Sequence, residues 1–175
     1  HGNLRPSNIL YWSNGHADLT DVGIGRSLVR EPWDDDPASF QAQQYFAPEL
    51  SSSLRATPGA DVYAAGVIAF HALAGRLPFD IADKRGLREL IGSETWPDLS
   101  PVLEAAGVTG VAEPLLKWLE RMMARFPNQR PDNAHQALFE LQEACKSSGI
   151  AIAADPGRVA APAANELAPG FARWE

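Results

Sequence analysis

The chain has 175 residues, of which 45% are hydrophobic, and it carries a formal net charge of -7. This length and apolar content are enough for one domain with one sizeable core. The acidic balance argues against a surface for nucleic acid or for an anionic membrane, because both need a basic patch and no charge run here is basic.

Two short strands are predicted first, in the stretch ILYWSNGHADLT. Asn14-Gly15 is the residue pair that most favours a two-residue hairpin turn, because both central positions need a positive φ. With that turn, the numbers of paired residues sum to 29, which places Asn8 opposite Asp21 at the open end. Their side-chain oxygens are then expected to lie about 5 Å apart.

Residues 22 to 44 show no lasting hydrophobic period and contain two prolines and three consecutive aspartates, so we expect a long exposed loop. The later stretch DVYAAGVIAFHALAG is apolar all round after Asp61, which predicts a helix buried on every side. Asp61 is expected to begin this helix and Gly75 to end it. At about 14 residues it is too short to cross a bilayer, so we expect it to be the central helix.

Two amphipathic outer helices are predicted over residues 112 to 126 and 133 to 146. Their expected inward faces carry Leu115, Leu119, Met122 and Phe126 in the first helix, and Ala134, Ala137, Leu138 and Leu141 in the second. A weaker helix is expected over residues 83 to 92, while prolines and glycines break residues 93 to 111. Because the composition then turns to Ala and Pro, we expect a domain over residues 1–150 and a linker or tail over 151–175.

No stretch of about 18 apolar residues and no charged-then-apolar leader is present, so the sequence predicts neither a membrane segment nor a signal peptide. The single cysteine, Cys145, excludes an internal disulfide and fits a reducing compartment. We therefore expect a cytoplasmic location, or the cytoplasmic side of a membrane protein. The chain starts at His1 and not at Met, so we expect that residues upstream have been cut away.

Five motifs occur in the order HGNLRPSN, TDVG, YFAPEL, DVYAAGV and RFPNQRP. In this order they resemble the catalytic loop, the D-F-G, the A-P-E, the buried central helix and the late structural arginine of eukaryotic-like Ser/Thr protein kinases. The resemblance implies a mainly α fold, the C-terminal lobe of such a kinase with a small β-hairpin. It also implies that the N-terminal lobe, with its glycine-rich loop and strand lysine, is absent from the chain and lies upstream.

The resemblance assigns metal binding to Asn8 and Asp21, which match the two metal ligands of the family. Phosphoryl transfer depends on neutralising phosphate charge, mainly through Mg²⁺ held by oxygen ligands. Binding of Mg²⁺ and ATP in a longer protein is therefore expected to use these two residues. The alternative is that Asn8 caps a turn and Asp21 starts a loop.

The chain departs from the family at the residues that would carry out transfer. The catalytic aspartate is replaced by Asn3, which can accept a hydrogen bond but cannot keep a proton at ordinary pH. Losing a general base typically costs about 10² to 10⁴ in rate. Arg5 replaces the family's lysine, and Ala42 replaces the threonine that contacts both groups. Three linked exchanges imply an impaired site.

Regulation by phosphorylation is also not expected. The family's loop arginine, which would bind a phosphate on the activation segment, is Gly2. That segment, residues 21 to 49, contains no threonine and has only Ser27 and Ser39 as simple acceptors. Its aspartates 34 to 36 either imitate a phosphate or form a solvated loop, and we prefer the solvated loop. Val22 replaces a phenylalanine whose packing couples the segment to the rest of the molecule, so weaker coupling is expected.

Two structural matches complete the resemblance. Glu49 and Arg130 match a buried ion pair, in which removal of one partner costs about 3 to 5 kcal/mol. The alternative is two unconnected charges. Asp61 matches the residue that holds the catalytic loop from the central helix, and this role can coexist with an N-cap.

The sequence therefore favours a pseudokinase module that acts in signalling or scaffolding by binding protein partners, with residual Mg-ATP binding left open. The alternative is part of an active or weakly active Ser/Thr protein kinase, in which Asn3 orients the hydroxyl and the phosphate accepts its proton. In both cases we expect no transfer by the 175-residue chain alone, because it lacks an N-terminal lobe.

Overall fold

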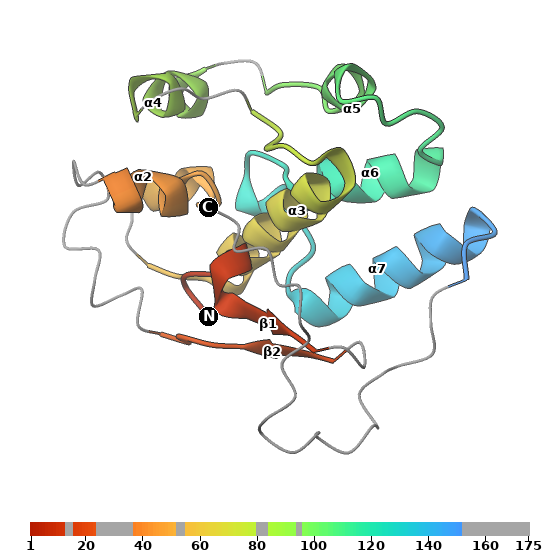
Figure 1. Cartoon of the computed structure of the whole chain (residues 1–175), viewed down its shortest axis with the longest axis horizontal. Helices are drawn as coiled ribbons and strands as arrows, with labels where there is room; N and C mark the ends of the chain where they lie inside the picture. Colours follow the sequence, from red (N-terminus) through yellow and green to blue (C-terminus); the bar gives the residue numbers. More distant parts are fainter. Residues whose placement is uncertain (13–15, 24–36, 52–54, 80–83, 94–95, 152–175) are drawn as a thin grey trace.

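The computed structural model describes residues 1–12, 16–23, 37–51, 55–79, 84–93 and 96–151. This part of the chain is mostly helical, with an antiparallel sheet of two short strands, and helix α3 runs through its middle (Figure 1). None of the described helices is long and apolar enough to span a membrane. In chain order, the elements are η1 (Pro6–Asn8), β1 (Ile9–Tyr11), β2 (Ala17–Leu19), α2 (Pro37–Gln43), η2 (Pro48–Ser51), α3 (Pro58–Ala74), α4 (Lys84–Gly92), α5 (Ser100–Ala105), α6 (Glu113–Met122), η3 (Pro127–Gln129) and α7 (Ala134–Ser147).

The central helix α3 begins about one turn before Asp61, which corrects its predicted start. The Thr57 hydroxyl oxygen accepts a hydrogen bond from the Ala60 amide at 3.1 Å and caps the helix. Gly75 ends the helix as predicted, with a φ of 66° that favours glycine. Leu73 is 50% exposed, so the helix is not buried on every side.

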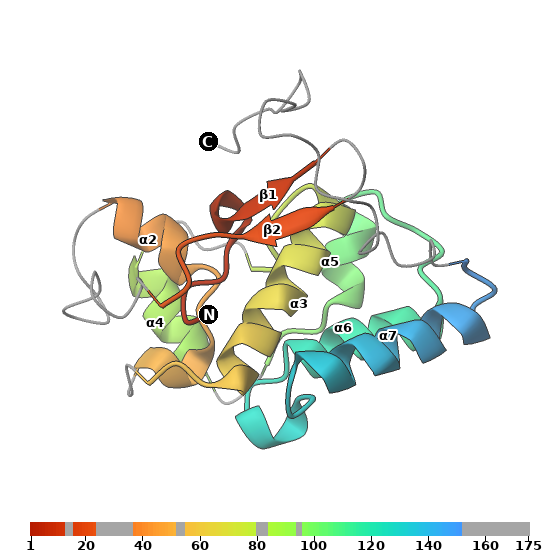
Figure 2. The same ribbon diagram turned by 90° about the horizontal axis from the view of Figure 1, so that it is seen from below.

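Helices α6 and α7 lie side by side against α3, on the side away from the hairpin (Figures 1 and 2). A Cβ atom on Gly66 of α3 would lie only 2.8 Å from side-chain atoms of Met122 and Met123. The close approach of α6 therefore requires a glycine at this position. The Trp118 indole N–H donates to the Ala137 carbonyl oxygen at 2.9 Å and joins α6 to α7.

Both outer helices are present as predicted, but their inward faces differ in part. Phe126 is 54% exposed, because α6 ends four residues earlier and the chain turns toward η3. In α7, Ala134 is exposed and Leu138 is 51% exposed, whereas Ala144 and Cys145 are buried. Ala137 is 5% exposed and faces inward as predicted, so the buried positions of α7 are Ala137, Ala144 and Cys145.

The hairpin pairs in a register one residue away from the predicted one. Paired residue numbers sum to 28 instead of 29. The Trp12 amide donates to the His16 carbonyl oxygen at 2.8 Å, which leaves three residues between the paired ends. These residues, 13 to 15, lie outside the described part. The residue opposite Asn8 is therefore Thr20 and not Asp21, and the Thr20 amide donates to the Asn8 carbonyl oxygen at 3.0 Å.

Two short helices lie where the sequence predicted irregular chain. Helix α2 occupies the end of the expected 22-to-44 loop, whose residues 24 to 36 lie outside the described part, and Gln43 at its end is 2% exposed. Helix α5 lies within residues 93 to 111, with Leu103 buried. Pro37 and Pro101 lie in the first turns of these helices, where a missing N–H costs nothing, so prolines that predicted breaks begin helices instead. The weaker helix predicted over residues 83 to 92 is confirmed as α4.

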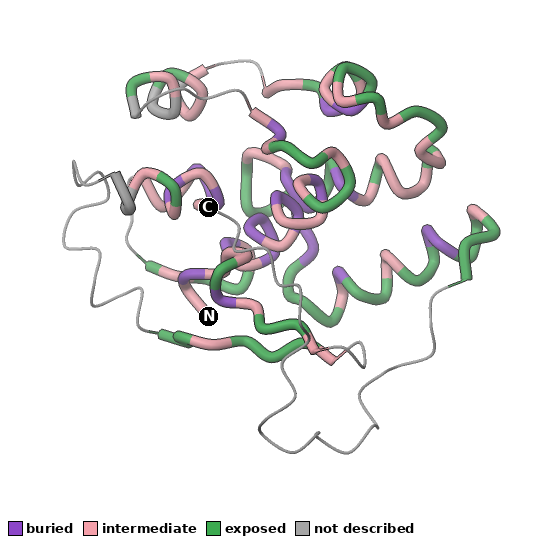
Figure 3. Tube along the Cα trace, viewed as in Figure 1, coloured by how far each residue is buried: buried purple, intermediate pink, exposed green. Residues whose placement is uncertain are grey.

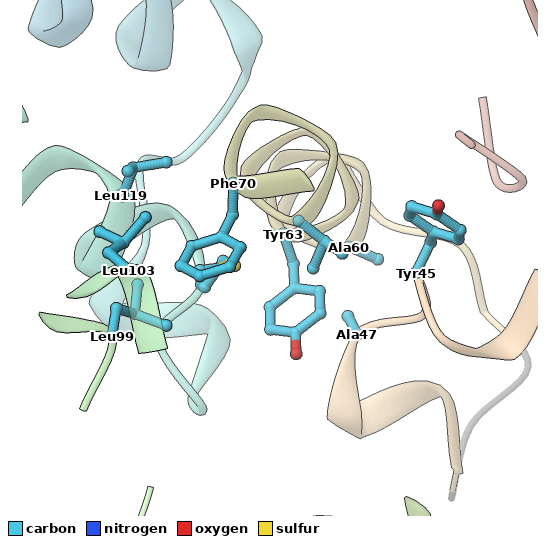
Figure 4. Close-up of a cluster of buried hydrophobic side chains, with 10 residues drawn as sticks. Tyr45, Ala47, Ala60, Tyr63, Phe70, Leu99, Leu103 and Leu119 are labelled. Atoms are coloured by element: carbon cyan, nitrogen blue, oxygen red, sulfur yellow. The ribbon is translucent and has the colours of Figure 1, made fainter. Parts of the chain in front are cut away.

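The hydrophobic core joins α3 to α5, α6 and the segment after α2, and the buried residues concentrate along α3 (Figure 3). Figure 4 shows its aromatic and aliphatic side chains facing one another from these elements. The buried members of this cluster are Tyr45, Ala47, Ala60, Tyr63, Val67, Phe70, Leu99, Leu103, Leu119 and Met123.

One charged side chain, Arg130, is enclosed at the edge of this core. Its side chain has no exposed area, and all five of its N–H groups donate hydrogen bonds. Two bonds of 2.8 Å reach the two carboxylate oxygens of Glu49, which confirms the predicted ion pair. The others reach the carbonyl oxygens of Gly59, Ala124 and Arg125 at 2.7 to 3.0 Å. The guanidinium also lies 4.9 Å from the centre of the Tyr63 ring.

Removing the Glu49 charge should strongly destabilise the fold. Glu49→Gln keeps the side-chain size but leaves Arg130 buried without its counter-charge, so the free energy of unfolding should fall by about 3 to 5 kcal/mol. Urea unfolding followed by circular dichroism measures this loss. The matched control is Glu143→Gln, because Glu143 pairs with Lys146 at 3.8 Å on the exposed face of α7 and its loss should change little. An equal effect of both substitutions would contradict the importance of the buried pair.

Candidate functional site

The loop that carries the predicted site residues is anchored to α3 through Asp61. The Asp61 carboxylate accepts hydrogen bonds from the main-chain nitrogen of His1 at 2.7 Å and from that of Gly2 at 2.9 Å. The role of Asp61 as a holder of the loop is thereby confirmed. Its proposed second role as N-cap is wrong, because Thr57 caps the helix.

The same loop is closed on itself by Asn8. The Asn8 side-chain nitrogen donates to the Asn3 carbonyl oxygen at 2.8 Å, and its main-chain nitrogen donates to the Arg5 carbonyl oxygen at 3.0 Å. Asn8 is 2% exposed and Asn3 is 8% exposed. The structure thus brings three of the four predicted site residues into one compact loop, with the side-chain amide of Asn8 as its internal brace.

Asp21 follows the hairpin and lies beside this loop. The chain on either side of it is bound to the loop, because the Thr20 amide donates to the Asn8 carbonyl oxygen and the Gly23 amide donates to the His1 carbonyl oxygen, both at 3.0 Å. Asp21 itself has a φ of 58°, a left-handed conformation that aspartate tolerates better than most residues. Its side chain is exposed.

The donor chemistry of Asn8 and Asp21 fits a hard cation such as Mg²⁺. The Asn8 amide nitrogen is already used within the loop, so its oxygen, which has the Ser7 hydroxyl at 3.4 Å, is the atom left for a ligand. Asp21 adds an exposed carboxylate, and amide and carboxylate oxygens are ligands that Mg²⁺ accepts. The described residues contain no group of three or more His, Cys, Asp or Glu side chains placed to hold a metal. A cation at this site would therefore need further oxygen ligands, such as phosphate or water.

Gly2 has a backbone that suits glycine alone. Its φ is 81°, and a Cβ atom at this position would lie 2.9 Å from the Ala56 Cβ atom. A side chain here would meet both backbone strain and a steric clash. A phosphate-binding arginine therefore cannot be restored at position 2 without moving the segment before α3.

The position of the predicted threonine replacement, Ala42, has no polar side chain. Ala42, in the last turn of α2, offers only a methyl group. The Arg5 Nε atom is buried without a hydrogen-bond partner, and so is the Oε1 atom of Gln43, the residue after Ala42. Arg5 thus keeps its charge but lacks a partner for this nitrogen.

A pocket of about 470 Å³ lies beside the loop, where His1, Val22 and Asp61 meet the start of α3 and α7. Val22 lines this pocket and is still 63% exposed. The imidazole nitrogens of His1 are buried in the same region without partners. Val22 therefore contributes little packing at the position where a larger side chain would fill the space.

The sequence did not predict a contact between Tyr45 and His71. The Tyr45 hydroxyl lies 3.0 Å from the His71 Nδ1 atom, and the two rings stack with centroids 6.4 Å apart. The signal for this contact in the sequence was His71, an ionisable residue within the otherwise apolar stretch of the central helix.

Three features are typical of a kinase-like domain. They are the loop anchored by Asp61, the hairpin of β1 and β2 that follows it, and the buried Glu49–Arg130 ion pair. A model of the protein kinase domain matches residues 1–141 of the chain. The chain therefore belongs to the protein kinase family.

Curated bacterial proteins are similar over part or most of the chain. PknK of Mycobacterium tuberculosis (strain CDC 1551 / Oshkosh), a serine/threonine-protein kinase, is 29% identical over 156 residues, which are 87% of this chain and 13% of that protein. The probable serine/threonine-protein kinase pknA2 of Bifidobacterium longum is 26% identical over 143 residues, 82% of this chain and 18% of the relative. PknB of Lactococcus lactis, a probable kinase of the same type, is 36% identical over 80 residues, 46% of this chain and 13% of the relative. The chain thus spans less than a fifth of the length of these relatives.

The brace formed by Asn8 can be tested by replacing its side-chain amide with a carboxylate. Asn8→Asp keeps the shape but leaves the Asn3 carbonyl oxygen without its hydrogen bond and opposes it with a carboxylate oxygen. The free energy of unfolding should fall by about 1 to 3 kcal/mol, measured by urea unfolding. Asn128→Asp, at an exposed position of η3, is the control and should leave stability nearly unchanged. Equal stability of both variants would show that the brace does not hold the loop.

Proposed function

We propose that residues 1–150 are the C-terminal lobe of a protein kinase domain that binds protein partners in signalling and does not transfer phosphate. The observation that carries this proposal is Asn3, which stands at the place of the catalytic base. The loop around Asn3 is held by Asp61 and braced by Asn8, which supports an ordered position for this residue. Because a side-chain amide cannot keep a proton, the loop supplies no general base there.

The surroundings of Asn3 support the same proposal. Arg5 has a buried Nε atom without a partner, and the hydroxyl that would complete the group is missing at Ala42. Gly2 excludes the arginine that would bind an activating phosphate, because any side chain there meets Ala56. The three linked exchanges at Asn3, Arg5 and Ala42 are more easily explained by a site no longer used for transfer than by a change of chemistry.

Nucleotide binding is a separate part of the proposal. In a protein that also carries the N-terminal lobe, we propose that the Asn8 amide oxygen and the Asp21 carboxylate would hold Mg²⁺, which would neutralise the phosphates of bound ATP. The use of the Asn8 nitrogen inside the loop supports this role, because it leaves the oxygen for a ligand. We also propose, from their Ala- and Pro-rich composition, that residues 151–175 are a linker that follows the lobe.

The second candidate is a weakly active Ser/Thr protein kinase. The observation that favours it is the intact anchoring of the loop by Asp61 and Asn8, since positioning carries much of phosphoryl transfer. In this case the Asn3 amide oxygen would orient the substrate hydroxyl, and the phosphate would accept its proton.

Transfer assays separate the two candidates. With radiolabelled ATP, Mg²⁺ and a generic protein substrate, neither the 175-residue chain nor a chain extended upstream through the N-terminal lobe should incorporate phosphate. In the extended chain, Asn3→Asp combined with Arg5→Lys and Ala42→Thr should raise transfer, because a base typically contributes about 10² to 10⁴ in rate. Transfer by the unaltered chain would establish the kinase candidate. A triple variant without transfer would show that these positions are not what limits activity.

Thermal unfolding of the extended chain tests the nucleotide part. Mg-ATP at about 100 times its dissociation constant should stabilise the protein by about 2.7 kcal/mol. Asp21→Asn should remove the part of this shift that depends on Mg²⁺, whereas the exposed control Asp132→Asn should keep it. A shift that Asp21→Asn leaves intact would contradict the assignment of the metal ligand, and no shift at millimolar nucleotide would remove ATP from the proposal.

A further inference from the structure

Tyr45 and His71 form a hydrogen-bonded contact between the activation segment and the central helix. Tyr45 lies just after α2 and is 9% exposed, while His71 lies in the last turn of α3 and is partly buried. The hydroxyl oxygen and Nδ1 are 3.0 Å apart, and the rings stack at an interplanar angle of 28°. The contact thus joins two segments that are 26 residues apart in the chain.

The protonation state of His71 decides how this bond is made. A phenol keeps its proton at neutral pH, and burial raises the pKa of Tyr45 further, so the hydroxyl is a donor. A neutral imidazole with its proton on Nε2 accepts this bond at Nδ1. A second proton makes Nδ1 a donor as well, so that two donors face each other until the hydroxyl turns, and it places a charge in a partly buried site.

The neighbours of His71 on its own helix do not titrate. Val67 and Ile68, one turn before His71 on α3, and Ala74 after it are apolar. The Tyr45 phenol is the titratable group that faces the imidazole from the activation segment. Burial lowers the pKa of His71, and no charge among the described residues contributes to that shift. The fold therefore favours the neutral ring.

We propose that the Tyr45–His71 contact is a pH-sensitive attachment of the activation segment to α3, closed when His71 is neutral and opened when it is protonated. Opening would also alter the surface beside Asn3. Tyr45 and Phe46 line a small cavity together with Gly2 and Asn3, so movement of Tyr45 changes one wall of that cavity. This inference does not depend on whether the lobe transfers phosphate.

The direction of the pH dependence follows from the lowered pKa of His71. The open state has an ordinary histidine pKa of about 6.5 and binds the proton more tightly than the closed state does. The contact is therefore most stable above about pH 6.5. Its stability is lost as the pH falls through the lower pKa that His71 has when the contact is closed.

Amide hydrogen exchange of the 175-residue chain measures this opening. Between about pH 7.5 and about pH 5.5, protection factors of α2 and of residues 44 to 47 should fall about three- to tenfold, while those of α7 should hold. Protection factors are compared because they correct for the intrinsic pH dependence of exchange. An NMR titration of the His71 ring in the same sample should give a pKa below the ordinary value.

Two variants and a matched control make the test specific. His71→Asn keeps a hydrogen-bonding side chain without titration in this range, so the pH response of α2 should disappear. Tyr45→Phe removes the hydroxyl and should reduce protection of α2 already at neutral pH. His135→Asn, at an exposed position of α7, should leave the response intact. The proposal is overturned if α2 protection in the unaltered chain does not change with pH, or if His71→Asn responds like the unaltered chain.

Discussion

The buried guanidinium of Arg130 is the interaction on which the rest of the structure depends. Its five donors reach Glu49 at the end of the activation segment, the first turn of α3 and the chain after α6. An isolated buried charge is costly, so these three segments must meet at one point for the charge to be satisfied. The start of α3 is fixed in this way, and with it Asp61, from which the loop containing Asn3 is held.

The parts of the fold that could be predicted from sequence are those set by local composition. An uninterrupted apolar stretch ending in Gly75 predicts α3, and two charged residues within the kinase-like motifs YFAPEL and RFPNQRP predict the Glu49–Arg130 pair. The predicted start of α3 is wrong because Thr57, and not Asp61, caps the helix and Pro58 lies in its first turn. The hairpin register was missed because Asn14-Gly15 favours a two-residue turn, whereas the strands pair across three residues.

The candidate site was predictable in its residues but less so in its geometry. The replacement of an acid by Asn3 is visible in the sequence, whereas the reason why Gly2 excludes an arginine needs the position of Ala56. The brace from Asn8 to the Asn3 carbonyl oxygen also depends on how the loop closes. The sequence pattern identifies which chemistry is missing, and the packing shows that a side chain at position 2 would meet Ala56.

The last residues of the activation segment are attached to α3 and its surroundings by two contacts of different kinds. Glu49 is held by an arginine, which stays charged in proteins, so a loss of proton from the guanidinium cannot release it. Tyr45, four residues earlier, is held by a histidine, the side chain whose charge changes most readily near neutral pH. If protonation opens the second contact, the first still fixes the chain at Glu49. The movement is then confined to α2 and the residues next to Tyr45, beside the loop that carries Asn3, while the core around Arg130 stays closed.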